Sequence, residues 1–318
     1  MSGNLFSNFA EKLAGKLFGP AGKLSVTAFG KHPGWDDHIY DLVVDSEALL
    51  AVRQYLYTDG IGSLIDSGEW EKTDPTQRIE KFNHAFFWFS PSDLIVGRMW
   101  SSTDGKGRSL YPMIICAHLS GGNNLHFAAP FLQQIERIEL ACRATLFADE
   151  VRIALDRGAA SLLDLIQNTP PPPPKTSFAP VLADLRFDDS HEELLRACYG
   201  IQSQIGGKKT GKPHPQIDLK LDQLEFFPQH IRLPASPPQT SQTVLFWNHL
   251  IHRLVGKLDF PILILAPPNE KFIDVVVGRP GPQQLACLRE NEAKIPCASL
   301  IPYNLTEEFK ATASALLV

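Results

Sequence analysis

The sequence predicts a mixed α/β fold (α+β), in which largely antiparallel, hairpin-built sheets are flanked by helices. Two pairs of apolar runs carry this prediction. Residues 86–89 and 94–96 are separated by Ser-Pro-Ser-Asp, and residues 260–265 and 272–277 by a turn that contains two prolines. Such runs, joined by a short turn, are typical of β-hairpins. Helical spacing of apolar residues around both hairpins predicts the flanking helices.

Composition places the chain among folded globular proteins. Of its 318 residues, 44% are hydrophobic and 20% charged, which excludes a disordered chain and allows one large domain or two ordinary ones. The net charge of -5 argues against a nucleic-acid partner, which needs clustered positive charge. No apolar run reaches transmembrane length, and the N-terminus lacks the order of a signal peptide. The five cysteines are odd in number and widely spaced, so we expect reduced thiols and a cytoplasmic protein.

The first half alternates strands and helices. Leu49, Val52 and Leu56 recur on one face of a predicted helix, and Pro130 is well placed to open a long helical stretch that we expect to end near Gly158. The expected elements are strands at 24–29, 86–89, 94–96 and 113–117, and helices at 46–65, 130–158 and 158–168.

A run of five prolines at 170–174 divides the chain, because neither a helix nor a central strand tolerates it. We therefore predict a first α/β domain at 23–168, a proline-rich spacer at 169–180 and a second α/β domain at 181–318. The run can also be read as a polyproline-II ligand for another domain.

Residues 1–22 form a separate N-terminal segment. Apolar residues recur at three- and four-residue spacing between Leu5 and Phe18, which predicts a short amphipathic helix ended by Gly19-Pro20. Two interpretations stay open. The helix folds back on its own domain, or it is an arm that docks on a partner or makes a peripheral contact with a membrane surface.

The second half repeats the order of the first. Its expected elements are a helix opened by a capping box at 190–193, a flexible basic loop at 206–213, a strand at 230–233, a helix at 244–254 and the hairpin at 260–277. The second strand of each hairpin ends in Val-Gly-Arg, at Arg98 and at Arg279. We hypothesise two related β-α-β-β units.

The candidate site begins at a polar loop, residues 101–112, which lies between two of the most apolar runs. Gly105 and Gly107 let its backbone bend, so the Asp104 carboxylate and the Arg108 guanidinium can meet across it. The pair is either an internal clasp that fixes the loop or a clasp that presents Lys106 to a partner.

Ser102, Asp104, Gly107 and Arg108, followed by Pro112, resemble the Ser-x-Asp-x-x-Gly-Arg…Pro pattern of the TagF family, associated with bacterial type VI secretion. Near the N-terminus, residues 30–38 resemble the family's Gly-Lys-Leu-Pro-x-x-Gly-Asp-Phe. Lys31, Pro33 and Asp37 match, whereas His32, Asp36 and His38 depart from the pattern, and one extra residue precedes Pro112. The resemblance covers roughly the first half of the chain.

The resemblance implies a non-enzymatic cytoplasmic accessory protein of a type VI secretion system, a contractile injection apparatus. Such a protein acts through protein–protein contacts after translation to restrain assembly, and the family is linked with the forkhead-associated scaffold protein of that system. It implies no catalytic residue and no cofactor. A hydrolase or phosphatase-like enzyme acting on an anionic substrate, and a structural baseplate-type component, are the alternatives.

Other chemistry finds less support. His32, Asp36, Asp37, His38 and Asp41 are metal-ligand types, but in an extended segment neighbouring side chains face opposite ways and cannot all converge. A Walker-type spacing at 206–212 is followed by Pro213 where a hydroxyl must reach magnesium. No nucleophile elbow is present.

Two further residues complete the partner-binding or loop-clasp set. Lys31 can join the clasp by pairing with Asp37 or Asp104. Trp35 in its Gly-Trp-Asp-Asp loop is either half exposed, as an interface anchor, or buried. The whole set is Lys31, Trp35, Asp37, Asp104, Lys106 and Arg108.

Overall fold

The computed structural model describes residues 23–42, 44–121, 124–170, 191–206, 227–236, 240–256 and 258–317. It confirms the mixed α/β class, with antiparallel strands and flanking helices. The expected amphipathic helix near the N-terminus, most of the proline run and most of the basic loop at 206–213 lie outside the described residues. Among the described residues, no helix is long and apolar enough to cross a membrane.

The chain divides into two compact units. Unit 1 contains Met1–Arg53 and Trp88–Pro172, and unit 2 contains Gln54–Phe87 and Pro173–Val318. The prolines therefore lie at one change of unit, but residues 54–87, which the sequence analysis places in the domain at 23–168, belong to unit 2.

Unit 1 is built on three antiparallel strands in the order β1-β4-β3: β1 (Leu24–Gly30), β3 (Asp93–Ser101) and β4 (Pro112–Ser120). Strand β2 (Asn83–Phe89) enters the unit with its last two residues and turns into β3, where the Ser90 N–H donates to the Asp93 carbonyl at 3.0 Å. All of β4 except Ser120 is buried, so both faces of this central strand are covered.

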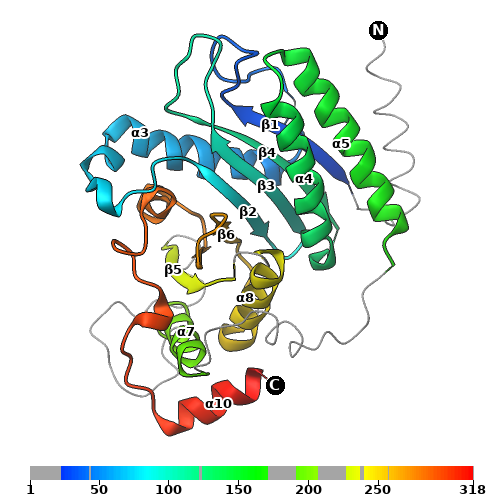
Figure 1. Ribbon diagram of the computed structural model, residues 1–318. Coiled ribbons are helices and arrows are strands. Elements are labelled where there is room, and N and C mark those ends of the chain that lie inside the picture. The colour runs from blue at the N-terminus through cyan, green and yellow to red at the C-terminus, as the bar shows by residue number, and fades with distance from the viewer. Residues whose placement is uncertain are drawn as a thin grey trace. The chain divides into compact units, whose positions relative to one another are not determined.

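Helices α4 (Ala128–Arg143) and α5 (Ala148–Asn168) lie side by side against these strands (Figure 1). The helix that was expected to end near Gly158 instead breaks at 144–147, and α5 continues through Gly158. A Cβ atom at Gly158 would lie 2.2 Å from Cδ1 of Ile138. This glycine therefore permits the close approach of α4, and it does not end the helix.

The expected helix at 46–65 is helical throughout but not uniform. It begins as α2 (Glu47–Val52), capped by the Ser46 hydroxyl, passes into the π-helical η1 (Arg53–Gly62) and ends as α3 (Ser63–Ser67) at Gly68, whose φ is +63°. Unit 1 ends and unit 2 begins at the start of the π-helical stretch.

Unit 2 contains strands β5 (Gln229–Pro234), β6 (Ile262–Ala266) and β7 (Phe272–Val277) in the order β6-β7-β5, all antiparallel. The unit-2 part of β2 lies next to β6. Its other elements are α7 (His191–Gln204), α8 (Thr240–Val255), α9 (Pro282–Leu285), η7 (Ala286–Arg289), η8 (Ala298–Leu300) and α10 (Glu307–Leu317), together with η2 (Trp70–Lys72) and η3 (Pro75–Gln77).

Hydrogen bonds explain why 54–87 belongs to unit 2. The Trp70 indole N–H donates to the Ala286 carbonyl at 3.2 Å. The Ile79 N–H donates to the Arg289 carbonyl at 2.8 Å, and the Arg289 Nε–H donates back to the Ile79 carbonyl at 2.5 Å. The Arg289 guanidinium also lies over the rings of Trp70 and Phe82. Residues distant in sequence thus share one set of contacts.

The order strand, helix, hairpin occurs in both halves, as expected. The two Val-Gly-Arg sequences are not equivalent, however. Gly97 lies inside β3, whereas Gly278 follows the end of β7 with φ +100°. A structural relation between the two β-α-β-β units stays a prediction.

Candidate functional site

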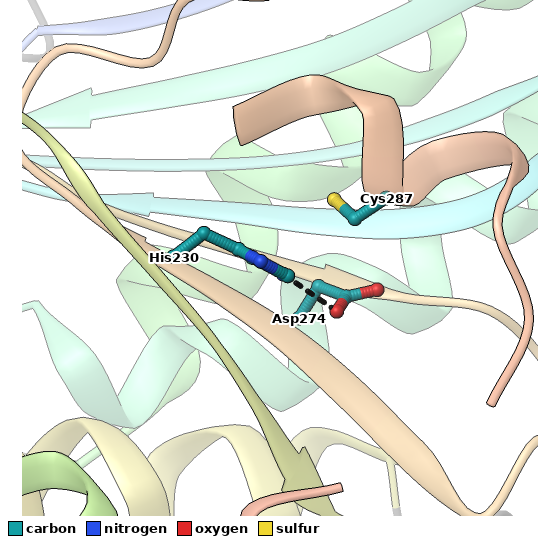
Figure 2. A group of neighbouring side chains, drawn as sticks. All are labelled: His230, Asp274 and Cys287. Carbon is teal, nitrogen blue, oxygen red and sulfur yellow. Dashed lines mark hydrogen bonds and ion pairs between the residues drawn. The ribbon is translucent and has the colours of Figure 1, made fainter. Parts of the chain in front are cut away.

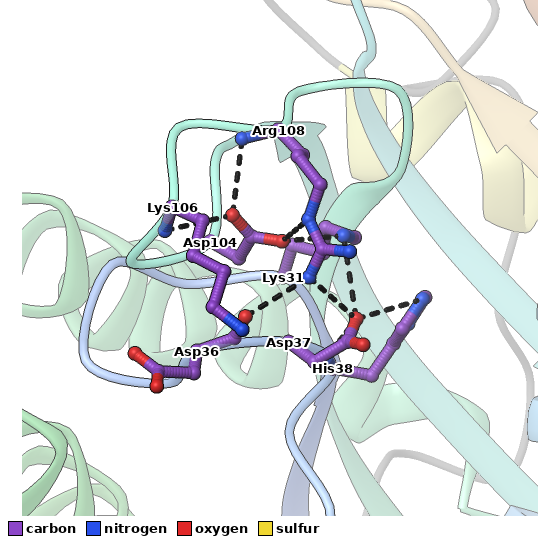
Figure 3. A network of polar contacts seen from close by, with 7 residues as sticks. All are labelled: Lys31, Asp36, Asp37, His38, Asp104, Lys106 and Arg108. Carbon is purple, nitrogen blue, oxygen red and sulfur yellow. Dashed lines mark hydrogen bonds and ion pairs between the residues drawn. The ribbon is translucent and has the colours of Figure 1, made fainter.

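The residues Lys31, Asp37, Asp104 and Arg108 meet in unit 1 and form what we call the clasp (Figure 3). Strand pairing brings them together. Because β1 and β4 are antiparallel neighbours, Gly30 at the end of β1 lies opposite Met113 near the start of β4, and the Lys31 N–H donates to the Pro112 carbonyl at 3.1 Å. The loop after β1 and the loop before β4 therefore leave the strands at the same end of the sheet.

Asp104 is the centre of the clasp and is 2% exposed. Its Oδ2 accepts from Lys31 Nζ at 2.6 Å and from Arg108 Nε at 2.7 Å, while Oδ1 accepts the backbone N–H groups of Lys106 and Arg108, both at 3.0 Å. Burial by itself raises the pKa of this carboxyl, but the Lys31 hydrogen bond and the donors from Arg108 and Lys106 hold the pKa well below its usual range. The carboxylate is therefore ionised and fully paired.

Asp37 forms the outer side of the clasp. Its Oδ1 lies 3.4 Å from Lys31 Nζ and 3.3 Å from the Arg108 guanidinium, and the side chain is 60% exposed. Desolvation acts to raise its pKa, but the positive charges of Arg108 and Lys31 outweigh this and lower the pKa. Arg108 also donates to the Asp36 carbonyl at 2.9 Å, so one guanidinium ties the two loops together.

Two glycines allow these loops to approach. Gly30 has φ +99°, and a Cβ there would lie 2.1 Å from the Pro112 carbonyl oxygen. Gly105 donates its N–H to the Trp35 carbonyl at 2.7 Å, and a Cβ on it would lie 3.0 Å from the Pro33 carbonyl oxygen. The outer surface of the clasp is formed by Lys106 and the half-exposed Arg108.

Trp35 is buried, with 5% exposure, so it is no exposed interface anchor. Its indole N–H donates to Asp41 Oδ1 at 2.8 Å, and the Arg152 guanidinium, which also pairs with Asp41, lies 5.5 Å from the centre of the ring. The indole, Asp41 and Arg152 together therefore fix the loop to the N-terminal part of α5.

The metal-ligand types at 32–41 do not converge. His32 accepts the Gly34 N–H at Nδ1, at 3.0 Å, and its Nε2 bonds the Cys142 carbonyl at 3.0 Å. Both ring nitrogens are thus occupied, and the hydrogen bond to a carbonyl makes Nε2 the protonated atom. Burial lowers the pKa of His32, in agreement with a neutral ring. Asp37 and Asp41 are each engaged by cationic side chains.

A second polar group, which sequence reasoning did not find, joins Ser46, His118 and Asp93. The Ser46 hydroxyl lies 2.9 Å from His118 Nδ1, and His118 Nε2 lies 2.8 Å from Asp93 Oδ1. This is the hydrogen-bond order of a catalytic triad. However, Ser46 Oγ also accepts the Leu49 N–H at 3.2 Å as the cap of α2, and His118 is only 3% exposed. We interpret the group as a structural tie between α2 and the β3–β4 pair.

A third group lies in unit 2, where His230, Asp274 and Cys287 place one ligand-type atom each within 4.8 Å of one another (Figure 2). Arg232 argues against a metal there. Its Nε and one terminal nitrogen each lie 2.9 Å from a different oxygen of Asp274, and a divalent cation would have to bind beside this buried guanidinium. Burial also raises the pKa of the Cys287 thiol well above its usual value.

Arg232 gives this third group a structural role. Its guanidinium also donates to the carbonyls of Glu290 at 2.8 Å and Ile295 at 3.1 Å, and it stacks 3.7 Å from the ring centre of Phe272. It thereby attaches the segment after η7 to strands β5 and β7. One partial signal is visible in the sequence: His230 and Arg232 share a face of the strand expected at 230–233.

Comparison with known proteins adds little. No model of a known protein family matches the chain, and no curated protein does. One solved structure that resembles it is PA0076 from Pseudomonas aeruginosa PAO1, with 19% sequence identity and a TM-score of 0.29. The match covers 47% of this chain and 64% of the other, less than two thirds of that protein's length. A TM-score this low carries no argument about fold or function.

Proposed function

We propose that this chain is a cytoplasmic, non-enzymatic accessory protein of a type VI secretion system, which acts through protein–protein contacts made around the clasp. The observation that carries the proposal is the bond between Lys31 and Asp104. These residues belong to two different segments that resemble the TagF patterns, they are separated by 73 positions, and they lie 2.6 Å apart. Asp37 and Arg108, which also match those patterns, complete the same group.

The clasp is suited to shaping a surface and poorly suited to chemistry. Asp104 is surrounded by four donors, so it has no free lone pair with which to act as a base. Lys31 is 4% exposed and is already paired with two carboxylates. With these charges matched internally, what the loop offers a partner is its fixed outer surface, at Lys106, Arg108 and Asp37.

Binding to the forkhead-associated scaffold protein of the same secretion system tests the proposal. Lys106→Glu reverses an exposed charge and leaves every clasp hydrogen bond in place, because only the backbone N–H of Lys106 takes part. We expect it to weaken binding in titration calorimetry by roughly tenfold, without a change in melting temperature. Lys294→Glu, an exposed charge reversal in unit 2, is the matched control and should bind normally.

An enzyme would give a different pattern. If the purified chain hydrolysed phosphate esters, and Arg108→Ala abolished that turnover, the phosphatase-like alternative would replace this proposal. Scaffold binding that is equally strong in Lys106→Glu and in Asp104→Asn would remove the clasp surface from the interaction.

A further inference from the structure

The carboxylate at the centre of the clasp belongs to an Asp-Gly pair, Asp104-Gly105, a dipeptide whose backbone can rearrange without an enzyme. The glycine nitrogen attacks Cγ of the aspartic acid, and the carboxyl hydroxyl leaves with the amide proton as water. The new N–Cγ bond closes a succinimide ring. Water then opens the ring at the Cα carbonyl and yields isoaspartate, in which the main chain runs through the former side chain. Glycine favours the attack because no Cβ hinders its nitrogen.

The fold itself sets both residues of this pair. Asp104 accepts four hydrogen bonds, which only a carboxylate can satisfy in this way. A Cβ on Gly105 would lie 3.0 Å from the Pro33 carbonyl oxygen and 3.2 Å from the Trp35 carbonyl oxygen, closer than ordinary contacts. The geometry that builds the clasp thus places a chemically labile pair at its centre.

The closed clasp keeps the two reacting groups apart. The attacking nitrogen is engaged, because the Gly105 N–H donates to the Trp35 carbonyl at 2.7 Å. The Asp104 side chain is turned to other donors, since its Oδ1 accepts the backbone N–H groups of Lys106 and Arg108, both at 3.0 Å (Figure 3). The Asp104 carbonyl also accepts the Gly107 N–H at 2.9 Å, so the main chain on both sides of the reacting bond is held.

The charge of Asp104 blocks the reaction as well, because only the protonated acid has a hydroxyl that can leave as water. Burial acts to raise the pKa of this carboxyl, but the Lys31 hydrogen bond and the donors from Arg108 and Lys106 hold the pKa well below its usual range. In an opened loop these donors are lost and the pKa returns toward its ordinary value. Gly105 is exposed, so the water that opens the ring can reach it.

We propose that Asp104-Gly105 is a site of spontaneous isoaspartate formation and that the clasp gates it, suppressing the reaction when closed and permitting it when open. Conversion adds one methylene group to the main chain and leaves the free carboxylate directly on Cα, where it cannot reach the same four donors. A converted clasp therefore cannot close again. When a loop opens and closes faster than it reacts, the reaction rate follows the population of the open form. The gate depends on the clasp contacts alone and not on the partner of the proposed function.

Storage of the full chain at neutral pH and physiological temperature, followed by tryptic peptide mapping, tests the gate. Asp104 lies in the tryptic peptide 99–106, where isoaspartate leaves the mass unchanged but shifts the elution and gives diagnostic fragments in electron-transfer dissociation. Peptide 54–72 of the same digest contains Asp59-Gly60, within the helical η1 of unit 2, and serves as the internal reference. The chain held in guanidinium chloride gives the unprotected rate of both pairs.

In the folded wild type, conversion at Asp104 should be at least about tenfold slower than in guanidinium chloride. Arg108→Ala removes the Nε donor but leaves residues 99–106 unchanged. It should convert Asp104 about tenfold faster than the wild type does, while Asp59 keeps its wild-type rate. Arg137→Ala, which removes an exposed guanidinium from α4 of the same unit, is the matched control and should behave as the wild type.

Three outcomes would overturn the proposal. One is conversion of Asp104 in the folded wild type as fast as in guanidinium chloride, and another is an equal rate in the wild type and Arg108→Ala. The third is acceleration of Asp104 and Asp59 together in that variant, which would trace the reaction to unfolding of the chain and not to the clasp. Brief trypsin digestion of the stored native chain should find isoaspartate among the chains cut after Lys106 first, because their clasp stays open.

Discussion

Asp104 is ionised in an almost buried position because four donors converge on it. We expect Asp104→Asn to lower the melting temperature by several degrees, since an amide NH2 group would face the Lys31 ammonium or the Arg108 guanidinium with the wrong polarity. Differential scanning calorimetry measures the shift. Lys106→Ala, which keeps its backbone donor, is the control, and equal melting of the two variants would contradict the role of Asp104.

Arg108 contributes to the clasp through its planar shape. Its Nε reaches Asp104, and its terminal nitrogen reaches both Asp37 and the Asp36 carbonyl. We expect Arg108→Ala to melt a few degrees lower, a smaller effect than that of Asp104→Asn because Lys31 still pairs with Asp104. Arg108→Lys should recover little, since an ammonium cannot bond these acceptors in the same fork. Full recovery by lysine would show that charge alone suffices.

The pH dependence of stability has a source in Asp93. The hydrogen bond from His118, followed by those from Ser92 and Ser90, lowers the pKa of this carboxyl to about 2 against an opposing effect of burial. A folded pKa below the unfolded one means that Asp93 stabilises the fold above about pH 4, by about 2 kcal/mol, and that this contribution is lost as the pH falls toward about 2.

Urea unfolding of the wild type and Asp93→Asn, repeated between about pH 7 and pH 2, checks this. The variant should be less stable at neutral pH, and the difference should shrink as the solution becomes acidic. A difference that stays constant over that range would show that Asp93 contributes through its shape and not through its charge.

Among the elements, the junction of β1 with its loop depends on Gly30. We expect Gly30→Ala to destabilise unit 1 by roughly 3 kcal/mol, because the residue has φ +99° and its Cβ would lie 2.1 Å from a backbone oxygen. Gly107→Ala is a matched comparison: its φ is +77°, but no atom lies within 4 Å of the added carbon. It should cost only about 1 kcal/mol by urea unfolding. Equal losses of stability in the two variants would mean that only the positive φ matters at Gly30 and that the close approach of the Pro112 carbonyl oxygen does not.

The boundaries of the helices and strands show which elements the sequence could predict. The turn of the first hairpin was predictable, because a proline and small polar residues at 90–93 interrupt two apolar runs. The break at 144–147 was not, since Ala-Thr-Leu-Phe contains neither proline nor glycine. Conversely, the sequence predicts a helix end at Gly158, because nothing local reveals that Ile138 packs against it.

Within the site, the meeting of Lys31 with Asp104 could be expected because both loops leave strand ends. The burial of Trp35 could not, since it depends on Asp41 and on Arg152 from a distant helix. The tie between Ser46, His118 and Asp93 forms no local motif. Only Ser46 lies at a predicted boundary, the start of the helix expected at 46–65, and the structure shows it as the cap of α2.

At the scale of the whole molecule, composition located one change of unit and missed the other two. A run of five prolines interrupts regular secondary structure in any chain, so this boundary is visible in the sequence. No comparable change of composition marks the two ends of residues 54–87. Their assignment to unit 2 depends on partners such as Ala286 and Arg289, which lie 216 and 210 positions along the chain from Trp70 and Ile79.

This arrangement predicts how a divided chain behaves. If residues 1–172 and 173–318 are produced as two polypeptides, we expect them to copurify, because residues 54–87 supply hydrogen bonds that unit 2 needs. Residues 173–318 alone should lack a cooperative thermal transition. A cooperative transition in that fragment by itself, or failure of the two pieces to associate, would show that unit 2 is complete without 54–87.

The interleaved units also set an order of events during synthesis. Trp70 and Phe82 leave the ribosome long before Arg289, whose guanidinium lies over both rings in the finished protein. Both aromatic side chains therefore lack their contact with Arg289 while some two hundred further residues are translated. That takes about 10–40 s at ordinary elongation rates. A nascent chain stalled before Arg289 should accordingly bind chaperones through 70–82, and release of the C-terminal residues should end that binding.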